Sequence, residues 1–409
     1  MIIRPKHVIL VLRSLSYNKP TEFYPVSRHV SRLLELQRAS FHCTAKSRSI
    51  FRSQQEQHVD TDVPDSGQPM EAWYYDVKKD GRLLVRSAMD VHVQPLDPQK
   101  HPSMNKLFIN ILYMGKDRLS SSELTALTKQ YIVNVDLDDT NEEMEISIKH
   151  KSSLPVPALC HLQVPIRYGI DVCCSKTGEA SLENLESENI RVRTQQGNCT
   201  FKSIKGFNVD VQSKEGSVMS SKVLQGNVKI VCGGNGSINV GRLQGQVVNC
   251  HSDQGDISAK AIYADNATFT ANCGNIHLGS CHGNSEVKIN EGHLTVDTLD
   301  GNLNGSIESG NTQIALSREG NVSFEVESGD ISLSVPKSLN CSMELCGTQI
   351  DMGEVTVHDS KMSEDSNLTK LAGHLSEEPV KGTIETRTNK GKIRLSYYDW
   401  LSSLNLGGK

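Results

Sequence analysis

A glycine recurs every 18 to 20 residues through the middle of the chain, and this spacing constrains the fold more than any other feature. The nine marker glycines are Gly178, Gly197, Gly216, Gly236, Gly255, Gly274, Gly292, Gly310 and Gly329. A second series falls about half a period later, at Gly206, Gly226, Gly245, Gly283, Gly301 and Gly320. Self-similarity at a fixed period indicates stacked structural units, each too small to bury an apolar face alone.

Side chains alternate after each marker glycine, as in the pairs Ile238/Val240 and Ile276/Leu278. Period-two alternation predicts strands with one buried and one wet face. The half-period glycines predict corners with a positive φ, and the same requirement at Gly255 would make its replacement by Val destabilising. The sequence thus predicts an all-β fold, a single-stranded parallel β-solenoid (β-helix) of about 19-residue coils. A β-sandwich also has many short strands, but it does not carry the same glycine at the same phase nine times.

The run VPIRYGIDVCCSKTGEASLENLESENIRVRTQQGNCTFKSIKGF and the coils after it carry a recurrent theme, S-x-x-G-D/N-I followed by a short strand. The theme is clear at residues 253–257 and 327–331. This stretch, residues 164–335 with a last coil at 386–395, resembles the putative-adhesin β-solenoid domain, a domain of unknown function found widely in bacteria. The whole chain is similar to a vertebrate protein of the "family with sequence similarity" type. The resemblance implies a fold and a mitochondrial compartment, and it carries over no catalytic residues.

The chain divides into five segments. Residues 1–53 contain ten Lys and Arg residues against two acidic ones, with interleaved serines, which is typical of a mitochondrial transit peptide directed to the matrix. A disordered basic tail is the alternative; a nucleic-acid arm is disfavoured because the remaining residues are acidic. Residues 54–69 are predicted to be a linker. Residues 70–160 are predicted to be a small β-rich N-terminal domain that caps the first coil and contains a helix near 120–130.

The solenoid repeats occupy residues 161–335, and residues 336–409 hold an irregular insertion, the last coil and a C-terminal cap. The aromatic residues at 397–401 are predicted to form the apolar lid on that last coil. No stretch approaches the roughly 20 apolar residues of a membrane span, so no transmembrane segment is predicted.

Eleven cysteines are scattered through the chain without a C-x-x-C pair, which favours buried thiols over zinc knuckles or redox chemistry. They are Cys43, Cys160, Cys173, Cys174, Cys199, Cys232, Cys250, Cys273, Cys281, Cys341 and Cys346. Seven Asn-x-Ser/Thr sequons occur, including those at Asn266 and Asn321, and these would accept glycans only on a secretory route.

Other groups that could carry chemistry are sparse. The histidines His251, His277, His282 and His293 lie in neighbouring coils, but their phases relative to the marker glycines differ, so a shared metal site is disfavoured. Acidic turns at Asp256, Asp300 and Asp330 lack the dense glycine-aspartate nonapeptide of calcium-binding solenoids. Nucleotide-binding and hydrolase motifs are absent from the sequence. We therefore predict no catalytic, metal-binding or cofactor-binding residues, and no cofactor.

The pattern favours a non-enzymatic β-solenoid scaffold or binding protein in mitochondria, with a protein rather than a nucleic acid as partner. Two alternatives stay open: a carbohydrate-active β-helix enzyme and an adhesin-like surface binding protein. The enzyme would need long loops that build a cleft, and the even spacing from Gly178 to Gly329 leaves little room for them. The sequence does not indicate the oligomeric state.

Overall fold

The computed structural model describes residues 67–151, 156–365 and 367–398, all within one compact unit. Strands β1–β26 form one hydrogen-bonded sheet, and α1 (Ser121–Thr128) is the helix of the described residues. The N-terminal strands are β1 (Gln68–Asp76), β2 (Arg82–Ser87), β3 (Asp90–Pro95), β4 (Lys106–Tyr113), β5 (Tyr131–Leu137), β6 (Glu143–His150) and β7 (Ala158–Val164).

The strands of the uninterrupted repeats are β8 (Gly169–Cys174), β9 (Ala180–Glu183), β10 (Glu186–Thr194), β11 (Cys199–Lys202), β12 (Ile204–Ser213), β13 (Val218–Cys232), β14 (Ile238–Ser252), β15 (Ile257–Cys273), β16 (Ile276–Glu291), β17 (Leu294–Ser309), β18 (Thr312–Leu316), β19 (Asn321–Ser328) and β20 (Ile331–Val335). The C-terminal strands are β21 (Cys341–Gly347), β22 (Gln349–Asp351), β23 (His358–Asp365), β24 (Leu368–His374), β25 (Gly382–Lys390) and β26 (Lys392–Tyr397).

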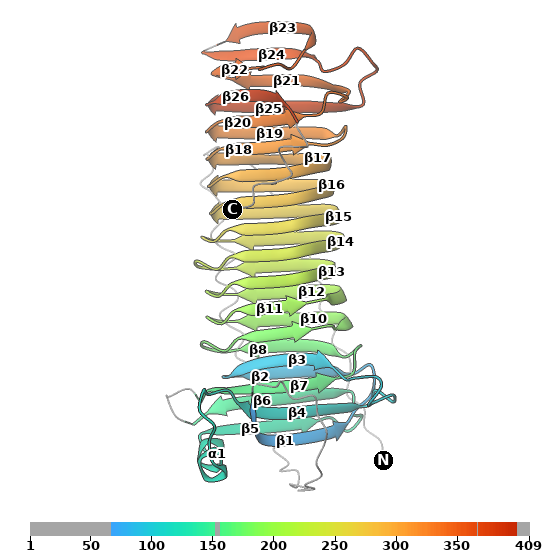
Figure 1. Ribbon diagram of the computed structural model, residues 1–409, viewed down its shortest axis with the longest axis vertical. Helices are drawn as coiled ribbons and strands as arrows, with labels where there is room; N and C mark the ends of the chain where they lie inside the picture. Colours follow the sequence, from blue (N-terminus) through green and yellow to red (C-terminus); the bar gives the residue numbers. More distant parts are fainter. Residues whose placement is uncertain (1–66, 152–155, 366, 399–409) are drawn as a thin grey trace, which may run out of the picture. The chain divides into compact units, whose positions relative to one another are not determined.

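Consecutive coils pair in parallel, with each residue opposite its counterpart one period later. Ile238 lies opposite Ile257, and Ile257 lies opposite Ile276. The inward side chains of the two strand faces form one continuous apolar core, in which Phe201, Phe269 and Phe324 are fully buried. The predicted all-β parallel solenoid is thereby confirmed, and Figure 1 shows the strands stacked one above another.

The half-period corners differ from the prediction of two short strands separated by a turn. Strands β13 to β17 each run 15 to 17 residues through the corner. Hydrogen bonding between coils continues across the bend, because Gly283 lies opposite both Ala264 and Gly301. Gly226, Gly283 and Gly301 have the expected positive φ, whereas Gly206, Gly245 and Gly320 do not. Because the corner has in-register neighbours in the coils on both sides, its backbone hydrogen bonds continue through the bend and no separate loop is needed.

Gly274, Gly292, Gly310 and Gly329 have a positive φ, but Gly255 is required for a different reason from the one predicted. Its φ is not positive, but a Cβ at this residue would lie 2.3 Å from the carbonyl oxygen of Gly236 in the neighbouring coil. At these turns the backbones of adjacent coils approach so closely that a side chain has no space.

The N-terminal strands join the solenoid without a break in hydrogen bonding. Strands β2 and β3 form the first coil, since they pair in parallel with β8 and β9 on one edge and with β6 and β7 on the other. Strands β1, β4 and β5 add antiparallel pairs beyond this coil. Helix α1 begins after Ser120, whose backbone N–H donates to Glu123 at 2.8 Å. Residue 160 lies within β7, and the predicted transit peptide and most of the predicted linker lie outside the described residues.

The C-terminal strands do not stack in sequence order. The coil of β25 and β26 lies between the coil of β19 and β20 and the coil of β21 and β22, and the β23–β24 hairpin pairs antiparallel beyond β21 (Figure 1). The aromatic lid predicted for residues 397–401 is therefore wrong at Tyr397, which pairs with Val335 inside the stack. Residues 399–401 lie outside the described part of the chain. None of the described helices has the length and apolarity needed to cross a membrane.

Candidate interaction surface

A ladder of polar side chains follows the marker glycines. The Asn275 N–H donates to Asp256 Oδ1 at 2.7 Å, and the His293 N–H donates to Asn275 Oδ1 at 3.0 Å. In the following coil the Asn311 N–H donates to His293 Nδ1 at 2.9 Å. Each side chain thus satisfies a backbone donor that the tight turn leaves without a ladder partner. Further contacts of this kind involve Asn198, Ser217, Asn311, Asp330 and Lys392. Asp256 and Asp330, considered above as acidic turns, have a structural role here.

The corners carry a second ladder, made of asparagines. Asn302 Nδ2 donates to Asn284 Oδ1 at 2.8 Å, and Asn208 Nδ2 donates to Asn189 Oδ1 at 3.0 Å. Asn321 Oδ1 in turn accepts the Thr383 hydroxyl at 3.1 Å. These amides stabilise the corners by bonding to one another, as stacked identical residues in adjacent coils allow.

The four histidines singled out above are not brought together. His251 Nε2 contacts Asp253 at 3.1 Å, and His277 Nε2 contacts Asp297 at 2.8 Å. His293 belongs to the ladder at the marker turns. Across the described ranges, no group of three or more His, Cys, Asp or Glu side chains is placed to hold a metal ion.

His282 belongs to a stack that the sequence analysis missed. The rings of Tyr263 and His282 lie parallel at 4.5 Å, and the Arg242 guanidinium lies 5.6 Å from the centre of the Tyr263 ring. Asp300 continues the stack with contacts to His282 at 3.2 Å and to Arg318 at 3.3 Å. Tyr263, His282 and Asp300 are register partners on consecutive coils, so their equal phase before the corner was the available signal. Because the Tyr263 ring lies between Arg242 and His282, its two faces are already used.

The ten described cysteines are free, and Cys43 lies outside the described residues. Burial raises the pKa of the Cys160 and Cys250 thiols to about 12. These side chains are neutral core residues at physiological pH, since thiolate character requires a lowered pKa. Cys273 is exposed.

A polar row in the N-terminal sheet also escaped the sequence analysis. Asn110, His161 and His92 lie side by side on β4, β7 and β3, and the two imidazole rings meet edge to face at 5.3 Å. Burial lowers the pKa of His92, against the opposing effect of Glu183. His161 and Asn110 are buried, so this row does not offer an accessible surface.

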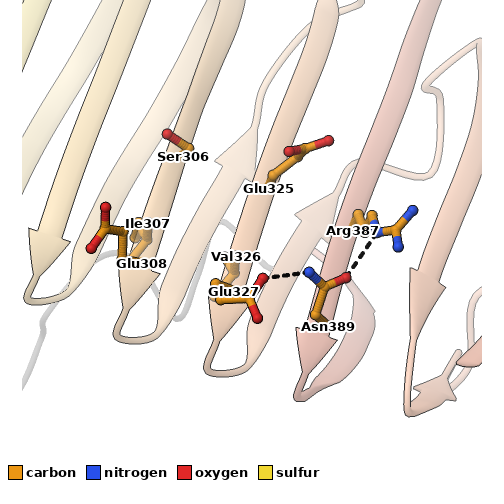
Figure 2. A pocket seen from close by; sticks show the side chains of 8 residues that line it. All are labelled: Ser306, Ile307, Glu308, Glu325, Val326, Glu327, Arg387 and Asn389. Carbon is orange, nitrogen blue, oxygen red and sulfur yellow. Dashed lines mark hydrogen bonds between the residues drawn. The ribbon is translucent and has the colours of Figure 1, made fainter. Parts of the chain in front are cut away.

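The most distinctive accessible surface is a group of five exposed glutamates on one strand face, which we call the acidic face: Glu308, Glu325, Glu327, Glu344 and Glu385. They project from β17, β19, β21 and β25. Figure 2 shows three of them around a shallow depression of about 140 Å³, together with Arg387 and Asn389.

The few cations on this face leave most of the carboxylates without a partner. Lys390 lies 3.7 Å from Glu327, whereas Arg387 is directed to Asn389, which accepts its Nε–H at 2.9 Å. Arg387 is the register partner of Glu325, yet the two do not form an ion pair. Among the described residues, Glu308, Glu325, Glu344 and Glu385 make no ion pair, so the negative charge is uncompensated.

The same strand face is charge-balanced nearer the N-terminal end. Arg191 on β10 lies 3.4 Å from Asp210 and 3.8 Å from Asp171, which also contacts Arg82 at 3.3 Å. The face therefore changes along its length from paired charges to unpaired carboxylates. A rigid surface of this kind can attract and orient a basic partner.

A second depression, of about 560 Å³, adjoins the acidic face at the terminal hairpin. Glu344, Glu385, Asp359, Lys361 and His374 contribute to its lining. Of the titratable side chains lining the two depressions, those at 308, 325, 327, 344, 359, 361, 385 and 387 are exposed and His374 is half-buried. His374 Nδ1 is buried without a hydrogen-bond partner, and the other titratable side chains of the two depressions are open to water.

Residues 219–396 match the family model described as Toastrack DUF4097. The match begins in β13 and ends in β26, so it covers the long coils and the displaced last coil. A crystal structure of a putative adhesin from Parabacteroides merdae ATCC 43184 is similar, with 12% identity, a TM-score of 0.37, and coverage of 81% of this chain and 97% of that chain.

Two further putative adhesins are similar. The one from Parabacteroides distasonis ATCC 8503 has 12% identity, a TM-score of 0.32, and coverage of 80% of this chain and 96% of that chain. The one from Bacteroides fragilis NCTC 9343 has 11% identity, a TM-score of 0.31, and coverage of 80% and 96%. At TM-scores this low, the similarity supports no conclusion about the fold or the activity of this chain.

Proposed function

We propose that this chain, whose residues 219–396 match the Toastrack DUF4097 family model, is a non-enzymatic binding scaffold. Its partner is a protein with a basic surface, and the acidic face is where that partner docks. The solenoid supplies a rigid support, because every strand from β8 to β20 is paired on both edges.

The observation that carries this proposal is the register of Glu344 and Glu385. These two residues lie directly opposite each other on β21 and β25, and both are exposed. Like charges at opposed positions destabilise a sheet, and among the described residues neither carboxylate makes an ion pair, although Lys361 lines the same depression. A partner that places Lys or Arg side chains over the face would remove the repulsion and gain charge-assisted hydrogen bonds.

Two features support a non-enzymatic role over a carbohydrate-active enzyme. The marker turns between β13 and β18 are short, so no long loops project from these coils to build a cleft. The carboxylates of the acidic face are exposed on a flat strand face and not enclosed in a pocket. Binding to such a face does not require a cleft.

We place the scaffold in mitochondria because of the composition of residues 1–53. Ten basic and two acidic residues with interleaved serines suit import into the matrix. In that compartment the sequons at Asn266 and Asn321 would stay unmodified, since the route bypasses glycan transfer.

Charge reversal on the acidic face tests the proposal. The variant E308K/E325K/E385K changes three glutamates that make no ion pair among the described residues. The matched control E188K/D265K/E354K reverses three exposed carboxylates that lie off this face and are likewise unpaired. Each variant and the native chain would carry a proximity-labelling enzyme in cells, with circular dichroism confirming the fold.

We expect the set of proteins labelled by the native chain to persist with the control variant and to be lost with the face variant. Labelling should also weaken as ionic strength rises in permeabilised mitochondria, because exposed charges are screened. Identical labelling by all three chains would refute the acidic face as the docking surface.

A further inference from the structure

The coil of β25 and β26 lies between two coils that precede it in the sequence. Strand β25 pairs in parallel with β19 on one edge and with β21 on the other, and β26 lies likewise between β20 and β22 (Figure 1). After Val335 the chain passes over one layer, and residues 382–397 fill that layer later. We call this layer the slot and residues 382–397 the spliced coil.

The edges of the slot match the spliced coil residue by residue. A Cβ at Gly391 would lie 1.9 Å from the carbonyl oxygen of Gly329, so only glycine fits there. The Lys392 N–H donates to Asp330 Oδ1 at 2.8 Å, and the Thr388 hydroxyl donates to the Gly329 carbonyl at 2.7 Å. These are the contacts that the marker turns make elsewhere, here across 62 residues of sequence.

The interior of the spliced coil completes the apolar core. Ile384, Ile393 and Leu395 are fully buried. If the slot were empty, the apolar side chains that pack against these three residues would be exposed. The strands on both sides of the slot would also present rows of unpaired backbone groups, which readily pair with a new strand. Residues 382–397 carry the glycine, threonine and lysine that match the edges of the slot. The same residues of a second copy of this chain would match them equally well.

The connections allow the spliced coil to leave while the other described strands stay in place. Residues 336–340 link β20 directly to β21, so the layers on both sides of the slot are joined without it. One polar connection, residues 375–381, leads into β25, and no described strand follows β26. The connection itself is held by the Leu375 N–H on the Cys341 carbonyl, the Lys381 N–H on the Asn340 carbonyl at 2.9 Å and the Asn340 amide on Glu378 at 2.9 Å. Glu377 also lies 3.4 Å from His358, and Leu375 packs against the core, so these contacts must break for the coil to leave.

We propose that the spliced coil is exchanged between two copies of this chain, so that residues 382–397 of each copy occupy the slot of the other. Closed and exchanged forms contain the same strand pairs and differ only in the path of residues 375–381. The equilibrium between the two forms therefore depends on two concentrations: that of the second copy, and the effective concentration of the chain's own tethered coil at its slot. The exchange is independent of the acidic-face proposal, because it needs no partner protein.

A disulfide trap tests the exchange in the full chain. Ser332 and Arg394 are register partners on β20 and β26, and both side chains point outward. Neighbouring strands lie about 4.8 Å apart, which suits a disulfide. One copy would carry S332C and a second, larger tagged copy R394C, both with C273S to remove the exposed thiol. The copies would be unfolded and refolded together, then oxidised.

We expect a disulfide-linked heterodimer of the two tagged chains on a non-reducing gel. The matched control pair is T295C on one copy and Q313C on the other, register partners on β17 and β18 in coils that follow sequence order. This pair should stay unlinked, because those coils are tied into the stack at both ends.

The double variant S332C/R394C in a single chain shows whether the geometry permits the bond. If this chain closes its internal disulfide while the mixed copies give no heterodimer, the exchange is refuted. A heterodimer from the control pair in equal yield would also refute it, since the link would then reflect non-specific association.

Discussion

Replacing Gly255 with Ala should destabilise the solenoid through contact with the neighbouring coil, not through backbone conformation. The added Cβ would lie 2.3 Å from the Gly236 carbonyl oxygen and 2.6 Å from its carbon, both backbone atoms that cannot rotate away. Separating the layers disturbs the ladder on both sides, and forced overpacking costs about 1–3 kcal/mol. The lower entropy of the unfolded Ala chain offsets about 0.4–1 kcal/mol. Because the clashing atoms are backbone and cannot move aside, we take the upper end of that range, about 3 kcal/mol, and expect a net loss of about 2 kcal/mol in the free energy of unfolding.

Gly234 provides the matched control, because it has a positive φ but no close contact with the neighbouring coil. Its φ is +53°, yet the nearest atom to an added Cβ is 3.5 Å away. A left-handed conformation costs a non-glycine residue about 1–2 kcal/mol, and the same entropic offset applies. Gly234→Ala should therefore lose about 1 kcal/mol or less. Urea unfolding followed by circular dichroism gives both values. Equal losses, or a neutral Gly255→Ala, would refute the close-contact explanation of the marker column.

Three other predictions concern the compartment, pH and the exposed polar groups. Residues 1–53 fused to a fluorescent reporter should direct it to mitochondria, and glycans on Asn266 or Asn321 of the full chain would contradict this. Burial raises the pKa of Cys160 and Cys250 from 9.0 to about 12, so these thiols lose their protons at a lower pH in the unfolded chain than in the folded one. The free energy of unfolding should therefore fall as the pH rises from about 9 to about 12. The fall should be less steep in a Cys250→Ser variant. Single alanine replacements should leave cellular function intact, with a stability loss of about 1 kcal/mol only where a backbone N–H loses its acceptor; the sites are Asp256, His277, Asp300 and Asp330.

The positions of the coils could be predicted because the information is local and repeated. Alternation such as Ile276/Leu278 specifies an inward face wherever a strand forms, and a glycine at constant phase specifies where adjacent backbones meet. Nine copies of one pattern leave little choice other than a parallel stack. Local information of another kind, a serine cap at Ser120, predicted the helix near 120–130, and the structure adds Glu123, which accepts the Ser120 N–H.

The candidate surface could not be predicted in this way. Glu344 and Glu385 are 41 residues apart in sequence and become neighbours only because β25 enters the stack beside β21. The stack from Arg242 to Arg318 required knowing that Tyr263, His282 and Asp300 share one register. Treated singly, Asp300 was an acidic turn and His282 an isolated histidine.

The sequence by itself determined the strand period, the inward residues and the glycine contacts, because each depends on residues within one coil or on identical residues one coil away. Only the tertiary structure decided the order of the last layers. Parallel pairing requires a matching edge but sets no limit on how far along the chain the matching strand lies, so residues 382–397 satisfy the edge of β19 as well as the next residues in sequence could. Tyr397 then lies inside the stack, and the C-terminal end of the described column is a hairpin whose strands carry no repeat signature.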